Sequence, residues 1–180
     1  MGHFYFVRHG QTTWNVADKI CGATDVELTE TGRQQAIDTG KKILEEGIHA
    51  DEILYSPLIR AAETARLISE VTGIPVREEP RLIEQSFGIW EGTSPRNSAE
   101  FKKAKQNFVS RFGNGESMLH LAQRIYNLLD DIKAEADEKT YILVAHNGIS
   151  RVVQSYFEDM TNEEFAGWTV KNCSVSRYDF

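Results

Sequence analysis

The 180-residue sequence predicts an α/β fold with a mainly parallel central sheet and helices on both of its faces. Two observations support this fold class. Short apolar runs typical of strands alternate with segments in which apolar residues recur at helical spacing, and such alternation is typical of parallel sheets whose strands are joined by helices. No internal repeat or low-complexity tract interrupts the pattern. Because domains cluster at about 100–150 residues, residues 1–180 are expected to form one domain.

Start and stop signals delimit the helices between the apolar runs. Thr29 is placed to cap the first helix, and Thr72-Gly73 followed by Pro75 predicts the end of the second. Thr161 and Glu164 form a capping-box pattern for a short helix near the end. The expected strands are Phe4–Val7, Ile53–Tyr55, Tyr141–Ala145 and Ser174–Tyr178, and the apolar stripes of the three longer helices are Ala36, Ile37, Ile43 and Leu44; Ala61, Ala62, Ala65, Ile68 and Val71; and Leu121, Ile125, Leu128, Leu129 and Ile132.

Composition and charge exclude several classes of protein. With 41% hydrophobic and 26% charged residues the chain is neither disordered nor fibrous, and its net charge of −7 argues against a nucleic-acid binder that works through overall charge. The two cysteines, Cys21 and Cys173, lack the spacing of a metal site, which favours a reducing, cytoplasmic compartment. No apolar run approaches the ~20 residues of a membrane helix. We therefore expect a cytoplasmic protein without a membrane partner, and the oligomeric state is left open.

Polar residues follow three of the predicted strands at the point where each strand ends. Arg8-His9 follows the first strand, Ser56 to Arg60 follows the second, and His146 follows the strand at Tyr141–Ala145. In open parallel sheets, ligands bind beyond the carboxyl ends of the strands. A single histidine at a strand end is more often structural, but three strands that deliver such groups to one edge predict a site.

These residue types are suited to phosphate. Arginine is the usual partner for bidentate phosphate recognition, and Arg8 and Arg60 come from different strand ends. Gly10 allows the backbone to approach a ligand closely. The site is therefore expected to hold a phosphate in front of the imidazole of His9.

Five motifs in order along the chain extend this prediction. On them, the sequence resembles the histidine phosphatase superfamily, also called the phosphoglycerate mutase-like family, from Phe4 to the last strand. The motif residues are Arg8, His9, Gly10, Thr12 and Asn15; Gly22, Asp25, Leu28, Thr29 and Gly32; Ser56, Leu58, Arg60, Ala61 and Thr64; Leu82, Glu84, Gly88, Trp90, Glu91 and Gly92; and Gly115, Glu116, Ser117 and Arg124.

The resemblance implies a role for each main site residue. His9 is implied to be the nucleophile that becomes phosphorylated, while Arg8, Arg60 and His146 bind the phosphoryl group. Glu84 is implied to donate a proton to the leaving oxygen and later to act as the base for water. The expected substrate-binding residues are Gly10, Thr12, Asn15, Cys21, Gly22 and Asn147.

The chemistry of these groups agrees with the implied roles. A neutral imidazole can attack phosphorus near neutral pH without a metal or cofactor. Two guanidinium groups and a protonated His146 are expected to stabilise the negative charge of the transferring group. Burial and the negative charge of phosphate favour a protonated carboxyl group at Glu84. The alternative for Glu84 is a solvated glutamate, since Glu78, Glu79 and Glu91 lie nearby in sequence.

One position departs from the family pattern. The family usually has two glycines after the second histidine, whereas this chain has Asn147-Gly148 after His146. Asparagine tolerates left-handed backbone angles, so we expect the turn to form. Whether the Asn147 side chain contacts phosphate or narrows the pocket is left open.

Some motif residues are expected to support the fold rather than the chemistry. Arg124 is expected to form an ion pair with Glu116. Ser56 and Thr64 are expected at a turn and a helix start, and not as nucleophiles.

Residues 92–115 are expected to be a small helical cap. This segment has a net charge of +4, which leaves −11 for the rest of the chain, and its phenylalanines Phe101, Phe108 and Phe112 lie at helical spacing. Two interpretations remain open. Either the lysines form a solvated face, or the inner face of the cap contacts the non-phosphate part of the substrate, as the resemblance implies. In the second case, exchanging Lys102, Lys103 and Lys105 for Gln should raise KM for anionic substrates.

The favoured function is a metal-independent phosphatase that acts on a small phosphorylated metabolite. The mutases of this family are usually longer, and Cys21-Gly22-Ala23 lacks their Ser-Gly pair. A cofactor-dependent phosphoglycerate mutase is the first alternative, and a non-catalytic phospho-ligand-binding module is the second. A metal hydrolase is disfavoured because two arginines aimed at one spot repel a divalent cation. The sequence does not identify the substrate.

Overall fold

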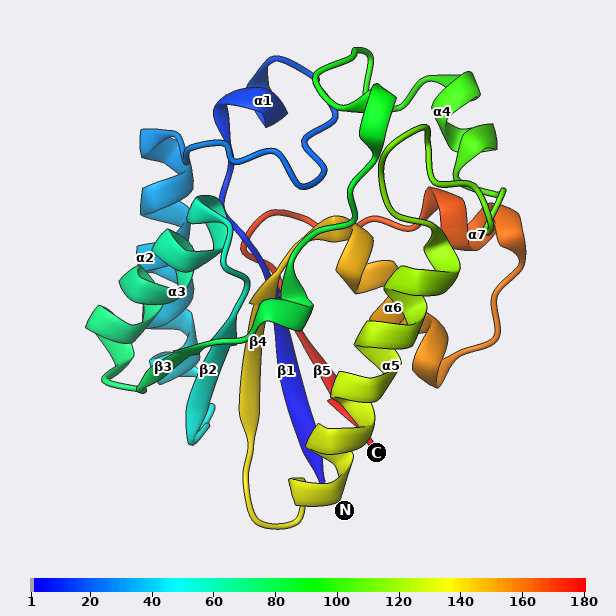
Figure 1. Ribbon diagram of the computed structural model, residues 1–180. Coiled ribbons are helices and arrows are strands. Elements are labelled where there is room, and N and C mark those ends of the chain that lie inside the picture. The colour runs from blue at the N-terminus through cyan, green and yellow to red at the C-terminus, as the bar shows by residue number, and fades with distance from the viewer. Residues whose placement is uncertain (1) are drawn as a thin grey trace.

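The computed structural model describes residues 2–180, and at its centre lies a five-stranded sheet of order β3-β2-β4-β1-β5 (Figure 1). All neighbouring strands are parallel except β5, which pairs antiparallel with β1 at one edge. The mainly parallel α/β fold class is thus confirmed. The strands are β1 (His3–Arg8), β2 (Glu52–Tyr55), β3 (Val76–Glu78), β4 (Tyr141–Ala145) and β5 (Val175–Asp179).

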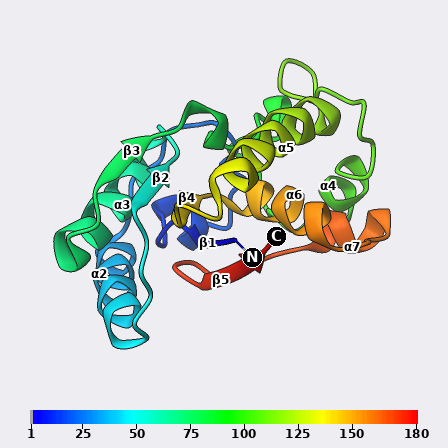
Figure 2. The ribbon, with the colours of Figure 1, turned by 90° about the horizontal axis from the view of Figure 1, so that it is seen from below.

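Helices cover both faces of this sheet. Helices α2 and α3 lie on one face, and α5 and α6 lie on the other (Figure 2). Helices α1, α4 and α7 lie beyond the carboxyl ends of β1, β2 and β4, at the end of the molecule opposite the two termini (Figure 1). Within residues 2–180, none of the helices combines the length and the apolar character needed to cross a membrane. The helices are α1 (Thr13–Val16), α2 (Glu30–Glu45), α3 (Ile59–Thr72), α4 (Ala99–Ala104), α5 (Met118–Glu135), α6 (Asn147–Phe157) and α7 (Asn162–Gly167), with 3₁₀ turns at Pro80–Leu82 and Gly88–Trp90.

The strand residues alternate between two apolar cores, as the two-residue period of a strand requires. In β1, Phe4 and Phe6 pack under α5 and α6, whereas Tyr5 and Val7 pack under α3. All five residues of β4 are buried. Parallel strands covered on both faces are expected to be apolar throughout, which explains why β4 was recognisable as a continuous apolar run.

The predicted helix ends are confirmed by their caps. The Thr29 side chain accepts a hydrogen bond from the N–H of Gly32 and starts α2. Helix α3 ends at Gly73, whose φ of +76° is the left-handed conformation that glycine adopts without strain. Thr161 and Glu164 form the expected capping box of α7.

Two local differences from the sequence prediction have physical causes. Strand β3 was not predicted, because it is a three-residue edge strand whose side chains are all exposed. The amphipathic helix expected through Phe112 is wrong beyond Ala104, where α4 ends. Phe101 and Phe112 are both buried against Phe87, but Phe112 reaches this cluster from a loop and with a φ of +54°.

Candidate active site

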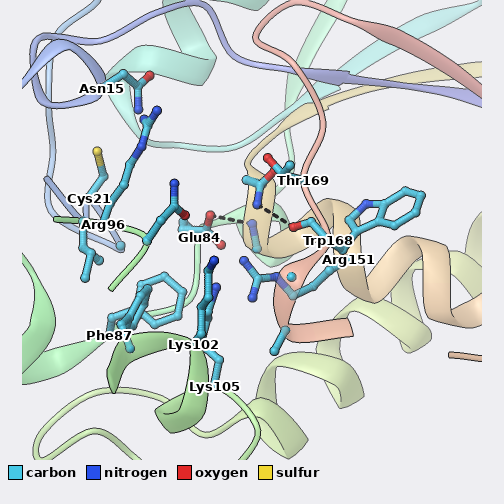
Figure 3. A pocket seen from close by; sticks show the side chains of 18 of the residues that line it. Asn15, Cys21, Glu84, Phe87, Arg96, Lys102, Lys105, Arg151, Trp168 and Thr169 are labelled. Carbon is cyan, nitrogen blue, oxygen red and sulfur yellow. Dashed lines mark hydrogen bonds between the residues drawn. The ribbon is translucent and has the colours of Figure 1, made fainter. Parts of the chain in front are cut away.

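A cavity of about 490 Å³ opens beyond the carboxyl ends of the parallel strands (Figure 3). The loop after β1, helices α3, α4, α6 and α7, and the segment around Glu84 all contribute to its wall. The edge of the sheet predicted to carry the site is therefore the edge that carries the cavity. Its lining includes Arg8, His9, Asn15, Cys21, Gly22, Arg60, Glu84, Arg96, Phe101, Lys102, Lys105, Asn147, Gly148, Arg151, Trp168 and Thr169.

The ring of His9 is held in one tautomer directly after β1. Its Nδ1–H donates a 2.7 Å hydrogen bond to the carbonyl oxygen of Gly10, which can only accept. The lone pair is therefore on Nε2. Burial and the guanidinium groups of Arg60 and Arg8 hold the pKa of His9 well below its usual range. His9 is thus a neutral imidazole with an unprotonated Nε2 at neutral pH.

Arg60 is buried and Arg8 is half-buried, and backbone carbonyls anchor both. Arg8 donates through Nη1 to the oxygen of Val170 at 2.6 Å, and Arg60 donates to the oxygens of Thr24 and Gly22 at 2.8 and 2.6 Å. Within residues 2–180, the Nε atoms of both arginines are buried without a hydrogen-bond partner. Burial lowers the pKa of Arg8 to about 10, so it remains a cation at neutral pH. The guanidinium groups of Arg8 and Arg60 therefore give the cavity a fixed positive charge, and some of their N–H donors have no protein partner among the described residues.

His146 lies beside His9, with the two ring centres 5.2 Å apart. Its Nε2 is 2.6 Å from the hydroxyl oxygen of Ser56, and its buried Nδ1 has no partner in the described part of the chain. Burial, followed by the charges of Arg60 and Arg8, holds the pKa of His146 well below its usual range. His146 is therefore neutral in the ligand-free protein, because burial and the nearby arginines oppose a further positive charge.

Glu84 is buried at the wall of the cavity and is not a solvated glutamate. Its Oε1 accepts from the N–H of Gln85 and its Oε2 accepts from the N–H of Gly148, both at 2.9 Å. Each carboxyl oxygen has two lone pairs, so these two hydrogen bonds fix the side chain and leave room for a proton.

The predicted substrate-binding residues divide into two groups. Asn15, Cys21, Gly22 and Asn147 line the cavity. Gly22 has a φ of +54° and its oxygen holds Arg60, so its contribution is to the backbone that positions the guanidinium group.

Gly10 and Thr12 are not among the cavity-lining residues of the described chain. The Thr12 side chain is fully buried and accepts from the N–H of Asn15, as the N-cap of α1. Gly10 packs its backbone against Gly32 and donates through its N–H to Thr64. Both residues shape the loop after β1, because the N–H of Gly10 and the hydroxyl of Thr12 form hydrogen bonds within the protein.

Asn147 adopts a helical conformation as the first residue of α6, so the left-handed turn expected there does not form. Its amide group bridges to the C-terminal segment, donating to the oxygen of Trp168 at 3.1 Å and accepting from the N–H of Val170 at 3.0 Å. The side chain thus fastens α6 to the segment after α7 rather than pointing a free donor at a phosphate.

The ion pair expected between Arg124 and Glu116 is confirmed. Arg124 forms a bidentate ion pair with Glu116 at 2.9 Å. Ser56 follows β2, where it contacts His146. Thr64 lies in the second turn of α3 and not at the helix start, and its hydroxyl accepts from the N–H of Gly10. Among residues 2–180, no cluster of three His, Cys, Asp or Glu side chains is arranged to hold a metal ion.

Arg151 was not among the predicted site residues, and Lys105 is more deeply buried than a lysine on a solvated face. Arg151 is 4% exposed and lines the cavity from α6. An arginine between Ile149, Val152 and Val153 on a helix that follows His146 was a signal, because a cation among core residues needs a reason. Lys105 is 5% exposed, so the solvated-face interpretation is wrong for it, whereas Lys103 is exposed.

Comparisons with known proteins agree with this geometry. Residues 4–180 match the model of the histidine phosphatase superfamily, branch 1. The probable phosphoglycerate mutase GpmB of Erwinia tasmaniensis is 33% identical over 97% of this chain and 83% of that protein. A mycobacterial glucosyl-3-phosphoglycerate phosphatase superposes with a TM-score of 0.82 at 26% identity, covering 98% of this chain and 90% of that one. A phosphoserine phosphatase mutant of Entamoeba histolytica gives 0.83 at 27% identity, covering 100% and 91%. The chain belongs to the histidine phosphatase superfamily and is an enzyme that acts on phosphate esters.

Proposed function

We propose that this protein is a metal-independent phosphatase that hydrolyses a small phosphorylated metabolite through a phosphohistidine at His9. The observation that carries the proposal is the Nδ1–H to Gly10 hydrogen bond, which leaves Nε2 unprotonated in a cavity lined by Arg8 and Arg60. A fixed tautomer and a low pKa make the imidazole a nucleophile near neutral pH without an activating metal.

In the first step, the Nε2 lone pair of His9 attacks phosphorus and an N–P bond forms. The bond from phosphorus to the ester oxygen breaks, and Glu84 gives its proton to that oxygen, so an alcohol leaves. The hydrogen bonds from Gln85 and Gly148 hold the carboxyl group in place for this transfer.

In the second step, Glu84 as carboxylate takes a proton from water while the water oxygen attacks phosphorus. The N–P bond breaks, inorganic phosphate is released, and both His9 and protonated Glu84 are restored. One residue therefore serves as acid and then as base.

Arg8, Arg60 and His146 stabilise the phosphoryl group in both steps. The unpartnered Nε–H groups of the arginines are available to the phosphoryl oxygens. If the Ser56 hydroxyl donates to His146 Nε2, the neutral ring carries its hydrogen on Nδ1 and can donate it as well. Donors fixed before the substrate arrives need no reorganisation during the reaction, which is how such sites lower the barrier.

The test is a phosphate-release screen over a panel of phosphomonoesters, with His9→Ala as the blank. We expect release by the wild-type protein that persists in excess EDTA, together with an acid-labile phosphoryl group on His9 after rapid quenching. Activity abolished by EDTA would indicate a metal hydrolase, and the absence of both turnover and phosphohistidine would indicate a binding module.

A phosphoglycerate mutase is the second candidate, because the GpmB relatives carry that name. The two activities separate in one assay on 3-phosphoglycerate. A phosphatase releases inorganic phosphate, whereas a mutase forms 2-phosphoglycerate with phosphate release far slower. Predominant isomerisation would overturn the phosphatase proposal.

A further inference from the structure

The segment between α7 and β5, residues 168–174, crosses the carboxyl ends of the parallel strands (Figure 1). Its position follows from the topology of the sheet. Strand β5 is antiparallel to β1, with Val175 opposite Val7, so the chain has to enter β5 at the carboxyl end of β1. That end is continuous with the loop that carries His9. Side chains of this segment are therefore placed to support the groups that act on a ligand.

Three hydrogen bonds fasten this segment to the end of β1. The carbonyl oxygen of Val170 accepts from Arg8 Nη1 at 2.6 Å, and the N–H of Cys173 donates to the carbonyl oxygen of Arg8 at 2.8 Å. Between these two contacts, Asn172 Nδ2 donates to the carbonyl oxygen of His9 at 2.8 Å. The segment uses backbone groups in the first two bonds and a side chain in the third. A substitution at Asn172 therefore removes one contact and leaves the other two in place.

The amide group of Asn172 also reaches Asn15, which lines the cavity (Figure 3). Asn172 Nδ2 donates to Asn15 Oδ1 at 3.4 Å. An NH2 group has two hydrogens, so Asn172 can serve the carbonyl oxygen of His9 and the amide oxygen of Asn15 together. Asn172 itself is not among the cavity-lining residues of the described chain. Its influence on a bound ligand therefore has to pass through its neighbours.

These contacts fix the direction in which the amide group of Asn15 faces. The carbonyl oxygen of His9 can only accept, so Asn172 has to present its NH2 group at this point. The backbone N–H of Thr12 can only donate, and it donates to the same Asn15 oxygen at 3.1 Å. With two donors on its oxygen, Asn15 turns its NH2 group the other way. Within residues 2–180, no protein acceptor is paired with that NH2 group.

The direction of the Asn15 amide group matters because the non-ester oxygens of a phosphate ester accept hydrogen bonds. An NH2 group directed at them adds a donor to those of Arg8 and Arg60, whereas an amide oxygen would place its lone pairs against theirs. The two orientations of an asparagine amide have nearly the same shape, so hydrogen bonds decide between them. The donors on Asn15 Oδ1 are therefore what makes Asn15 suitable for an anion.

We propose that Asn172 is a positioning residue for phosphate recognition. Anchored on the carbonyl oxygen of His9, it holds the amide oxygen of Asn15 and so keeps the NH2 group of Asn15 directed at the phosphoryl group. The nucleophile and a phosphate ligand are thereby tied to each other through one side chain. This inference rests on the proposed phosphatase function, because it takes the anion in front of His9 to be a phosphoryl group.

The experiment is a double-mutant cycle in which the Kd for inorganic phosphate is measured by isothermal titration calorimetry. The four proteins are the wild type, Asn172→Ala, Asn15→Ala and the variant that carries both substitutions. Ser174→Ala is the matched control, because the Ser174 hydroxyl lies in the same segment and donates a 2.8 Å hydrogen bond to the carbonyl oxygen of Lys171, within the segment itself. In addition, the ¹⁵N resonance of the Asn15 side-chain amide is followed as phosphate is added.

Asn172→Ala should raise the Kd by about fivefold, because Asn15 then loses one of the two donors that orient it. Ser174→Ala should keep the wild-type Kd. In the Asn15→Ala background, Asn172→Ala should change the Kd by less than about twofold, because the group that Asn172 orients is already absent. The Asn15 amide resonance should shift when phosphate binds to the wild-type protein, and this shift should be smaller in Asn172→Ala.

Equal increases in Kd in the two backgrounds would overturn the inference, because Asn172 would then act on the fold and not through Asn15. An unchanged Kd in Asn172→Ala, or an Asn15 resonance that does not respond to phosphate in the wild-type protein, would overturn it as well. If Asn172→Ala does not fold, Asn172→Leu, which has nearly the shape of asparagine without its donors, takes its place in the cycle.

Phosphate binding does not require turnover, so the two proposals can fail separately. A wild-type protein that binds phosphate but does not hydrolyse p-nitrophenyl phosphate would contradict the phosphatase proposal alone. Absence of phosphate binding by the wild-type protein would overturn the role of Asn172 whatever the turnover.

Discussion

The backbone N–H of Gly148 donates a 2.9 Å hydrogen bond to Glu84 Oε2, and a Cβ at Gly148 would overlap the other carboxyl oxygen of Glu84. The carboxyl group therefore occupies the space that any larger residue would fill. This explains why a glycine stands here although Asn147 replaces its neighbour in the family pattern.

Gly148→Ala should separate activity from stability. The added methyl group displaces Glu84, so kcat should fall by about 100-fold, within the range that general acids contribute. Alanine favours a helix by about 1 kcal/mol relative to glycine, so the melting temperature should not fall steeply. Steady-state kinetics and thermal unfolding of the same variant check both statements. A variant with wild-type kcat would show that Glu84 does not need this position.

Ser56→Ala should impair His146 without removing it. Loss of the 2.6 Å contact leaves Nε2 of His146 buried without its hydroxyl partner, and such a loss costs about 1–3 kcal/mol. We expect the rate of phosphorylation of His9 to fall about tenfold and the ¹⁵N resonances of the His146 ring to shift. Ser69→Ala is the control, because the Ser69 hydroxyl also makes a 2.6 Å hydrogen bond, but to the carbonyl oxygen of Ile74 near the far end of α3. Unchanged ring resonances in Ser56→Ala would contradict the positioning role.

Gly22→Ala tests the backbone that holds Arg60. Gly22 has a φ of +54° and a Cβ there would overlap Glu91, whereas Gly47 has a φ of +64° in open space. Both alanine variants should lose about 1 kcal/mol of stability from the strained backbone. Only Gly22→Ala should also raise the Ki for inorganic phosphate, by about tenfold, because its carbonyl positions Arg60. Equal Ki values in the two variants would argue against this link.

The two buried histidines should make stability depend on pH. The pKa values of His9 and His146 in the folded protein lie well below the unfolded value of about 6.5. Below about pH 6.5 the unfolded chain therefore binds protons that the folded protein does not. The free energy of unfolding should fall as pH falls, approaching about 1.4 kcal/mol per pH unit for each histidine.

Urea unfolding at about pH 7.5, 6.5 and 5.5 measures this dependence. Between about pH 6.5 and 5.5, His9→Gln should lose about half of the slope that the two histidines contribute, since only His146 of the two then remains. A variant that keeps the full slope would show that His9 is not held neutral in the folded protein.

Much of the fold could be read from the sequence because its signals are local. The continuous apolar run of β4 follows from burial on both faces, and the caps at Thr29 and Gly73 follow from backbone hydrogen bonds and a left-handed turn. The edge strand at Val76–Glu78 has no such pattern, because an exposed strand needs no apolar residues.

Some residues of the candidate site could likewise be predicted from local signals, and others could not. Arg8, His9, Arg60 and Glu84 could be found in the sequence because the geometry of a parallel sheet brings residues at strand ends to one edge, and motif spacing supplied the rest. Gly10 and Thr12 belong to the same motif but shape the loop instead, since their hydrogen bonds are internal.

The sequence by itself determined the fold class, the edge of the sheet that carries the site and the residue types suited to phosphate, because periodicity and strand-end position are local properties of the chain. Only the tertiary structure decided which tautomer His9 adopts, that His146 is neutral, and that Arg151 meets Lys105 in the cavity. Tautomers, pKa values and unpartnered donors depend on burial and on charges from distant segments, which chain folding brings within a few ångströms of one another.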